Sequence, residues 1–161
     1  MKKSLIVAAL IFVLGTASAI AQPRAVGVRL GYGVEFSYQH GMGDNMLSID
    51  AGLPGFAGIE AAVTYDWINP FHTQIPWNNK GEWNWSLGVG AAAGWWWISS
   101  YNYAFVGVAG RVGVEYNFWF PLQLSVEWRP AFGPNFGKDH CGFYGNGLYA
   151  GGFAIGVRYK F

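Results

Sequence analysis

Charged residues are scarce in this chain of 161 residues: Asp, Glu, Lys and Arg make up 12% of it, whereas hydrophobic residues make up 52%. An average soluble domain carries about 25% charged residues, so this composition argues against an ordinary soluble fold. A membrane-spanning helix needs about 20 consecutive apolar residues, and no run after Leu14 is that long and apolar. The apolar residues must therefore follow another pattern.

Cysteine is limited to Cys141, which has no partner for an internal disulfide, so we expect a free thiol there. The glycine-rich stretches Gly31–Gly33 and Gly145–Gly147 do not open helices, which excludes a phosphate-binding loop. Without Lys2 and Lys3, 8 basic residues stand against 9 acidic ones, a balance that indicates no nucleic-acid partner. We expect no metal site, no cofactor and no catalytic residues.

The N-terminus has the features of a secretory signal peptide. Two lysines precede an apolar run from Leu5 to Leu14, and Ala19-Ile20-Ala21 forms a small-residue cleavage site. The alternative is a membrane anchor, but the apolar run is too short to span a bilayer. We expect cleavage after Ala21, which leaves one domain over residues 22–161 in an exported setting.

After this segment, large apolar residues alternate with small or polar ones throughout the chain. The alternation is found in Val26–Tyr38, Leu47–Leu53, Ile59–Trp67, Trp83–Trp95, Val106–Tyr116, Leu122–Trp128 and Phe153–Phe161. Period-2 alternation puts the two sets on opposite faces of a β-strand. One face is apolar and uncharged, and the other carries Gly, Ala and nearly all the mid-strand charges, which is the pattern of a transmembrane β-barrel.

These runs number seven, whereas a single-chain bacterial barrel has an even number of strands. The most economical solution splits the first run at Gly31-Tyr32-Gly33, where glycines permit a tight turn. The prediction is then an all-β, up-and-down antiparallel barrel of eight strands. The rival is one long first strand, with the missing strand hidden in a loop.

The split fixes an alternating topology. Gly41–Asn45 and Asn117–Pro121 become short periplasmic turns, and Ile68–Gly81 becomes a long periplasmic connection. Ser99–Asn102 and Ala131–Gly147 fall outside the cell, the second as the longest external loop.

Three segments carry a more specific resemblance. Glu115-Tyr116-Asn117-Phe118, Pro121–Phe132 and Gly156–Phe161 resemble a family of small outer-membrane β-barrel proteins of the Bacteroidetes type. Its architecture is similar to the barrels of outer-membrane proteins A and X. The resemblance implies location in the outer membrane of a Gram-negative cell, with lipid around the barrel. It also implies that the barrel assembly machinery recognises the aromatic residues Tyr159 and Phe161, and it transfers no catalytic residue.

The strand phases place a balanced set of charges inside the barrel. The predicted inward cations are Arg29, Arg111, Arg129 and Arg158, with Lys160 at the rim, and the predicted inward anions are Glu35, Asp50, Glu60, Asp66, Glu115 and Glu127. Side chains nearly fill the bore of an eight-stranded barrel, and buried charges require partners. We expect an ion-paired plug, in which loss of Glu115 would unpair an arginine; the alternative is an ion or solute path.

Aromatic residues are abundant, at 19% of the chain, and many fall near predicted strand ends. Such positions are typical of the aromatic girdles at the two bilayer interfaces. The alternative for Trp95-Trp96-Trp97 is a carbohydrate-binding platform. The phase of Trp96 points inward, unlike that of its two neighbours.

The expected function is that of a structural or surface-exposed outer-membrane protein, without an open pore and without catalysis. The first alternative is an adhesion or ligand-binding role through the external loop 131–147. The second is a lipid A-modifying barrel enzyme, a class that uses His with Ser. Of the three histidines, His40 and His72 are expected in the periplasm, and no His-x-Ser follows His140.

Overall fold

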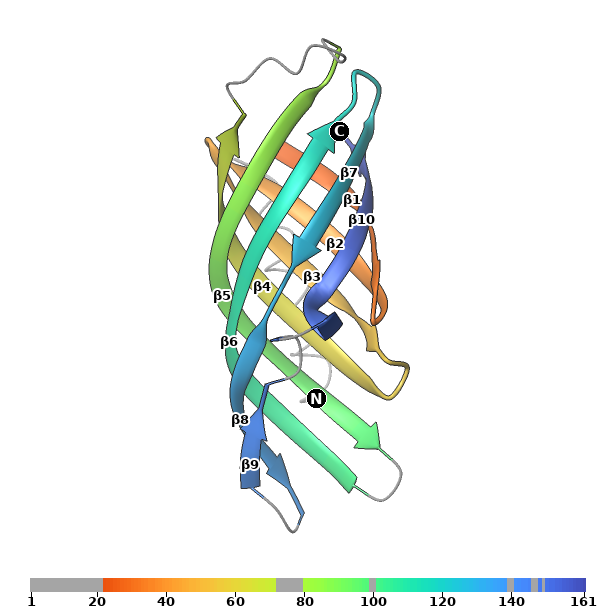
Figure 1. The fold of residues 1–161 in the computed structure, drawn as a ribbon, viewed down its shortest axis with the longest axis vertical. Coiled ribbons are helices and arrows are strands. Elements are labelled where there is room, and N and C mark those ends of the chain that lie inside the picture. The colour runs from red at the N-terminus through yellow and green to blue at the C-terminus, as the bar shows by residue number, and fades with distance from the viewer. Residues whose placement is uncertain (1–21, 72–79, 99–100, 139–140, 146–147, 149) are drawn as a thin grey trace, which may run out of the picture.

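The alternating segments form β-strands that close into a barrel (Figure 1). The computed structural model describes residues 22–71, 80–98, 101–138, 141–145, 148 and 150–161. Its strands are β1 (Gln22–Gly31), β2 (Gly33–Met42), β3 (Asn45–Pro54), β4 (Gly58–Pro70), β5 (Glu82–Ile98), β6 (Tyr101–Asn117), β7 (Leu122–Trp128), β8 (Ala131–Gly137), β9 (Cys141–Tyr144) and β10 (Phe153–Lys160). A short 3-10 helix, η2 (Ala150–Gly152), precedes β10. The predicted signal peptide lies outside the described residues.

The barrel is an eight-stranded antiparallel meander, as predicted. Each strand from β1 to β6 pairs with the next, β6 pairs with β7, and β7 pairs with β10. β10 returns to β1, in a register that runs from Ala25 opposite Lys160 to Gly31 opposite Ala154. The break between β1 and β2 at Tyr32 confirms the split of the first run. No helix in the described part of the chain is long and apolar enough to cross a membrane.

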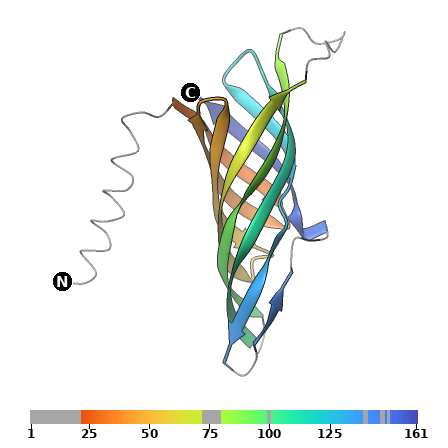
Figure 2. The ribbon, with the colours of Figure 1, turned by 90° about the vertical axis from the view of Figure 1, so that its left-hand side faces the viewer.

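The segment Ala131–Gly147 was expected to be a loop, and this prediction is wrong for most of its length. β8 continues β7 along β6 after an interruption at Pro130, and β9 pairs with β8. The seventh strand of the barrel therefore consists of β7 and β8, and the hairpin β8–β9 extends the wall past η2 (Figure 2). Two other predicted connections are also partly strand. Tyr101 and Asn102 belong to β6, and Ile68–Pro70 belong to β4.

The two ends of the barrel differ. We call the end with the C-terminus and the turns Gly43–Asp44 and Phe118–Pro121 the terminal end (Figure 1). The opposite end, called the hairpin end, holds the turn at Tyr32, the turn Gly55–Ala57 and the β8–β9 hairpin. β5 and β6 have 17 residues each, whereas β1, β2 and β3 have 10 each. The wall is therefore taller on the β5–β6 side.

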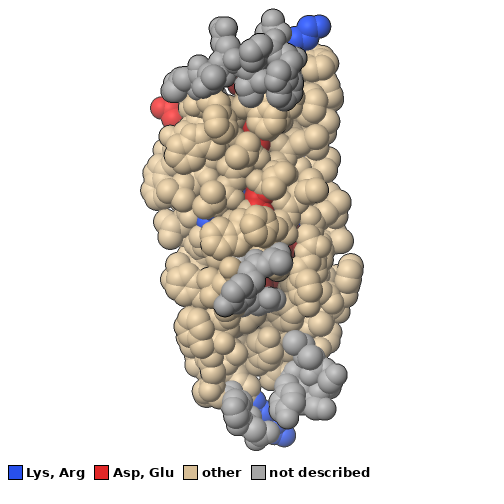
Figure 3. Space-filling view, viewed as in Figure 1, with Lys and Arg blue, Asp and Glu red and all other residues tan. Residues whose placement is uncertain are grey.

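The outer wall is apolar and the interior is polar, because the strand phases hold around the barrel. Val63 (42% exposed), Val89 (50%) and Val126 (57%) face outward. Uncharged residues cover most of the face shown in Figure 3. Towards the hairpin end the interior becomes apolar, with Trp96, Phe105 and Tyr144 packed among small alanines.

Inward glycines provide the space that the long interior side chains occupy. A methyl group on Gly88 would overlap the carboxylate of Asp66, and one on Gly156 would overlap Ser125 Oγ and the Arg158 guanidinium. The outward Gly110 is different, since the nearest atom to its added methyl group is Pro130 Cγ at 3.4 Å, an ordinary contact. The space beside Gly88 is therefore part of the charged interior.

We expect Gly88→Ala to destabilise the barrel by about 1–3 kcal/mol through overpacking, because Asp66 would have to leave its position. Gly110→Ala is the matched control and should be close to neutral. The measurement is the urea midpoint of the folded protein in detergent. Equal midpoints for Gly88→Ala and the wild type would show that this glycine does not shape the interior.

Candidate functional site

The charged interior is the candidate site, and its members are the residues predicted from the strand phases. Each of the ten predicted residues is at most 9% exposed: Arg29, Glu35, Asp50, Glu60, Asp66, Arg111, Glu115, Glu127, Arg129 and Arg158. Lys160 lies at the rim, where its Nζ donates to the carbonyl oxygen of Phe118 at 2.9 Å. The prediction of an interior filled by charged and polar side chains is confirmed.

Glu127 on β7 is the centre of the network. Its Oε2 accepts hydrogen bonds from Arg111 Nη1 at 2.5 Å and from Arg29 Nε at 2.9 Å. Its Oε1 accepts from Arg158 Nη2 and from Ser125 Oγ, both at 2.6 Å. These three arginines come from β6, β1 and β10, so one carboxylate joins four strands across the bore.

Asp50 on β3 provides a second anionic position beside this centre. It accepts hydrogen bonds from Arg111 Nη2 and, at 2.7 Å, from Ser37 Oγ. Asp66 lies nearby, with its Oδ2 at 2.5 Å from Ser48 Oγ and 3.4 Å from Arg111 Nε. The guanidinium of Arg111 is thus shared among carboxylates from three strands.

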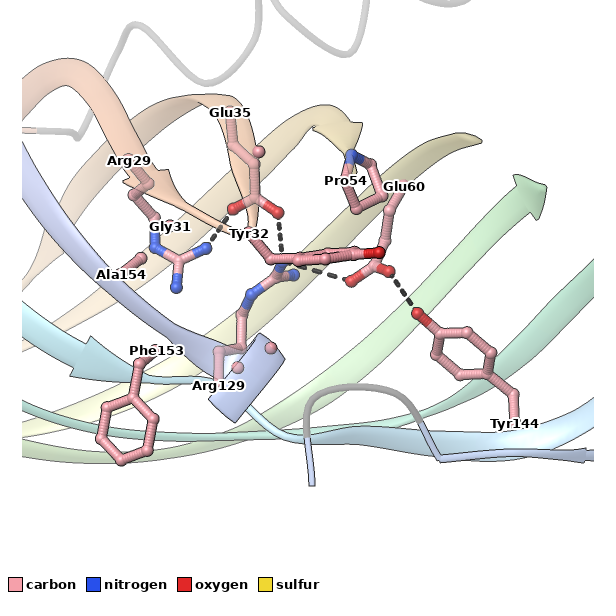
Figure 4. Close-up of a pocket in the computed structure, with 13 residues that line it drawn as sticks. Arg29, Gly31, Tyr32, Glu35, Pro54, Glu60, Arg129, Tyr144, Phe153 and Ala154 are labelled. Carbon is pink, nitrogen blue, oxygen red and sulfur yellow. Dashed lines mark hydrogen bonds and ion pairs between the residues drawn. The ribbon is translucent and has the colours of Figure 1, made fainter. Parts of the chain in front are cut away.

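Towards the hairpin end the network continues through Glu35, which pairs with Arg29 and, at 2.6 Å, with Arg129 Nη2. The same Nη2 lies 3.2 Å from Glu60 Oε1, and the Tyr144 hydroxyl donates to Glu60 Oε2 at 2.9 Å. Figure 4 shows these groups around Tyr32, with Glu35 above its ring in that view and Arg129 below it. Tyr144 on β9 therefore connects the hairpin to the charged interior.

Towards the terminal end, Glu115 is held by Arg24 and three amides. Asn84, Asn117 and Gln123 donate to its carboxylate at 3.2, 3.0 and 3.1 Å, and Arg24 forms the ion pair. The sequence did not assign Arg24 to the interior, since its parity in β1 points outward. A register shift between Pro23 and Ala25 reverses that phase, as a β-bulge does.

The separate groups form one connected chain of side chains. Arg158 Nη1 donates to Gln123 Oε1 at 3.3 Å, and Gln123 in turn reaches Glu115. The hydrogen bonds therefore extend from Tyr144 at the hairpin end to Arg24 at the terminal end. Because arginine stays protonated in proteins, the guanidinium groups hold the carboxylates in place and do not act as proton carriers.

The three consecutive tryptophans do not form a common platform. Trp95 and Trp97 face outward, at 53% and 42% exposed, whereas Trp96 is 2% exposed. The Trp96 ring stacks inside the barrel on Tyr103, with an angle of 7° between the ring planes. The inward phase of Trp96 is confirmed.

Of the other residues considered for chemistry, His40 lies on β2 with its Nδ1 3.1 Å from the Tyr38 hydroxyl. His72 and His140 lie outside the described residues. Cys141 begins β9 and is exposed. Within the described ranges, no group of three or more His, Cys, Asp or Glu residues is arranged to hold a metal ion.

We expect Glu127→Gln to destabilise the folded barrel by about 3–5 kcal/mol, because the change leaves buried arginines without their shared anion. Asp44→Asn, at the exposed terminal-end turn, is the control and should stay within about 0.5 kcal/mol. The measurement is the free energy of unfolding in urea, with heat resistance of the folded band on gels as a second readout. Equal effects of the two changes would contradict a central role for Glu127.

Comparison with known proteins gives no relative for this chain. No family model matches it, and neither a curated protein nor a solved structure matches it. The functional argument therefore depends on the fold and on the contacts of its own side chains.

Proposed function

We propose that this chain is an integral outer-membrane β-barrel with a structural or surface-exposed role, an ion-paired bore and no catalytic activity. The observation that carries the proposal is the inversion of polarity: an uncharged, apolar outer wall surrounds a buried charged interior. A soluble barrel would present the opposite arrangement to water. A closed barrel also satisfies the backbone hydrogen bonds that lipid cannot.

The proposed assembly follows from the closing strand. β10 ends in Tyr159 and Lys160, followed by Phe161, and the two aromatic side chains are 55% and 66% exposed on the outer face. Their rings contact each other edge to face, with centroids 5.5 Å apart. We propose that the outer-membrane assembly machinery recognises this pair of aromatic residues. The sequence resemblance to Bacteroidetes-type outer-membrane barrels implies the same recognition.

In the proposed orientation, the terminal end of the barrel faces the periplasm and the hairpin end faces the outside of the cell. Two exposed lysines report on the two ends. Lys138 follows β8 at the hairpin end, and Lys80 precedes β5 at the terminal end, where it lies over the ring of Trp119. Trypsin can therefore distinguish the two faces.

We expect trypsin added to intact cells to cut after Lys138 and to leave Lys80 uncut until the outer membrane is permeabilised. Peptide mapping by mass spectrometry identifies the cut. Lys138→Gln is the matched control and should abolish cleavage in intact cells. Cleavage at Lys80 in intact cells would reverse the proposed orientation, and protection of both sites after permeabilisation would contradict exposure at either end.

The bore is proposed to be closed. A hydrated ion would have to pass Glu127 and its three arginines, and breaking a buried ion pair costs about 3–5 kcal/mol.

We expect the purified wild-type protein to add no steady conductance to a planar lipid bilayer. The control is Asp44→Asn, which leaves the ion pairs intact and should be equally silent. Steady single-channel currents from the wild type would show that the bore conducts and would favour the ion-path alternative.

A further inference from the structure

A pocket opens at the hairpin end, between the β1–β2 turn and the start of β10, and the structural role proposed above does not use it. Tyr32 and Phe153, which are 56% and 55% exposed, lie at its mouth. Glu35, Glu60 and Arg129 line it from the barrel interior (Figure 4). Its volume is about 30 Å³, which admits one group of the size of a water molecule or a hydroxyl.

Arg129 has hydrogen-bonding capacity that the described residues leave unused. Its Nη2 is bonded to Glu35 and Glu60. Its Nη1 and Nε are buried and have no hydrogen-bond partner in the described part of the chain, although Nε lies 3.9 Å from Asp50 Oδ2. Since buried donors nearly always find an acceptor, the unused Nη1 and Nε of Arg129 show that hydrogen bonding beside this pocket is incomplete within the described part of the chain.

The charges around the pocket favour a neutral ligand. The cations Arg29 and Arg129 balance the anions Glu35 and Glu60, so an ion gains no net attraction. Each carboxylate oxygen can accept more than one hydrogen bond, and here each accepts one from the residues around it. The pocket thus offers donors and acceptors side by side, which a hydroxyl group matches because it both donates and accepts.

We propose that this pocket binds the hydroxyl-bearing edge of a saccharide. One hydroxyl enters the pocket and donates to Glu35 or Glu60, and a small rotation of the Arg129 side chain brings its Nη1 within reach of the same oxygen atom. The sugar ring remains at the mouth, against the exposed ring of Tyr32. In small-molecule sites, aromatic side chains provide contact area and a small number of polar groups fix the orientation of the ligand; here Tyr32 and the two glutamates take these roles.

Two sources could supply this chemistry: a free glycan, or the head group of a glycolipid in the surrounding membrane. The mouth adjoins the apolar outer wall, since Leu30 and Phe153 near it are 46% and 55% exposed. Acyl chains of a glycolipid could lie along that wall. Only the glycolipid source depends on the proposed membrane location; the free-glycan source does not.

The test is a titration of the full chain in detergent micelles, followed by the backbone amide resonances of Gly31 and Gly33 in two-dimensional NMR. The probes are the methyl glycosides of glucose, galactose, mannose and N-acetylglucosamine. We expect at least one to cause saturable shifts at these glycines and none at Gly110, which lies away from the pocket. Tyr32→Ala should weaken binding about tenfold, the loss of about 1.4 kcal/mol.

Phe136→Ala is the matched control, because Phe136 is a similarly exposed aromatic residue (52%) of β8 that does not line the pocket. It should leave the affinity unchanged; an equal loss would contradict the site. Amide spectra of both variants show whether they fold as the wild type does. Sodium phosphate should cause no saturable shift, and phosphate binding without sugar binding would replace the proposal with an anion site.

A parallel arm uses phosphatidylcholine vesicles with and without a glycosyl diacylglycerol. Saturable shifts with this glycolipid alone identify a lipid head group, and shifts with the methyl glycosides identify a free glycan. An absence of shifts in both arms would show that water alone fills the pocket and would overturn the proposal. The trypsin experiment tests the membrane location separately. A negative result for the saccharide pocket therefore leaves the proposed membrane location intact, and the reverse also holds for a free glycan.

Discussion

The structure depends on the rule that a buried charge needs a partner. Glu127 could not be taken out of water alone, and its hydrogen bonds to Arg29, Arg111 and Arg158 compensate for the lost hydration. These arginines lie on β1, β6 and β10, and the first is 98 residues from Glu127 in the sequence. The network is therefore complete only when β10 pairs with β1. Closure of the wall therefore brings the three arginines together around Glu127.

The same rule explains the high glycine content. Arginine side chains are long, and the bore of an eight-stranded barrel is narrow. Room is made on the inward positions of the strands, where Gly88 accommodates Asp66 and Gly156 accommodates Arg158. The outward positions need no such space and carry Val, Leu, Phe and Trp. Small residues lie inside because long charged groups fill the bore. Large apolar residues lie outside because the outer wall is apolar.

Period-2 alternation predicted the strands and the inward set, because residue parity alone decides which face a side chain occupies. The break at Tyr32 was predicted from the even number of strands in a barrel and from the glycines on either side of Tyr32. The alternation could not predict which carboxylate meets which guanidinium, since that depends on the stagger between strands. It also failed for Arg24, where the register shift after Pro23 reverses the parity. β8 was missed because Pro130, Pro134 and the nearby glycines resemble a loop. Phe132 and Phe136, at the same parity and both exposed, were the available signal.

Two charged side chains of the network keep buried polar atoms without a hydrogen-bond partner among the described residues: Asp66 through Oδ1, and Arg129 through Nε and Nη1. At mid-barrel, Glu127 is enclosed by strands, and both of its oxygens are hydrogen-bonded. Nearer the hairpin end, β1, β2 and β3 have already turned, while β5 and β6 continue. Arg129 lies beside this lower part of the rim, and Glu35 and Glu60 engage only its Nη2. The unused nitrogens of Arg129 therefore lie where the wall is low, beside the turns that end β1 and β3 at Tyr32 and Pro54.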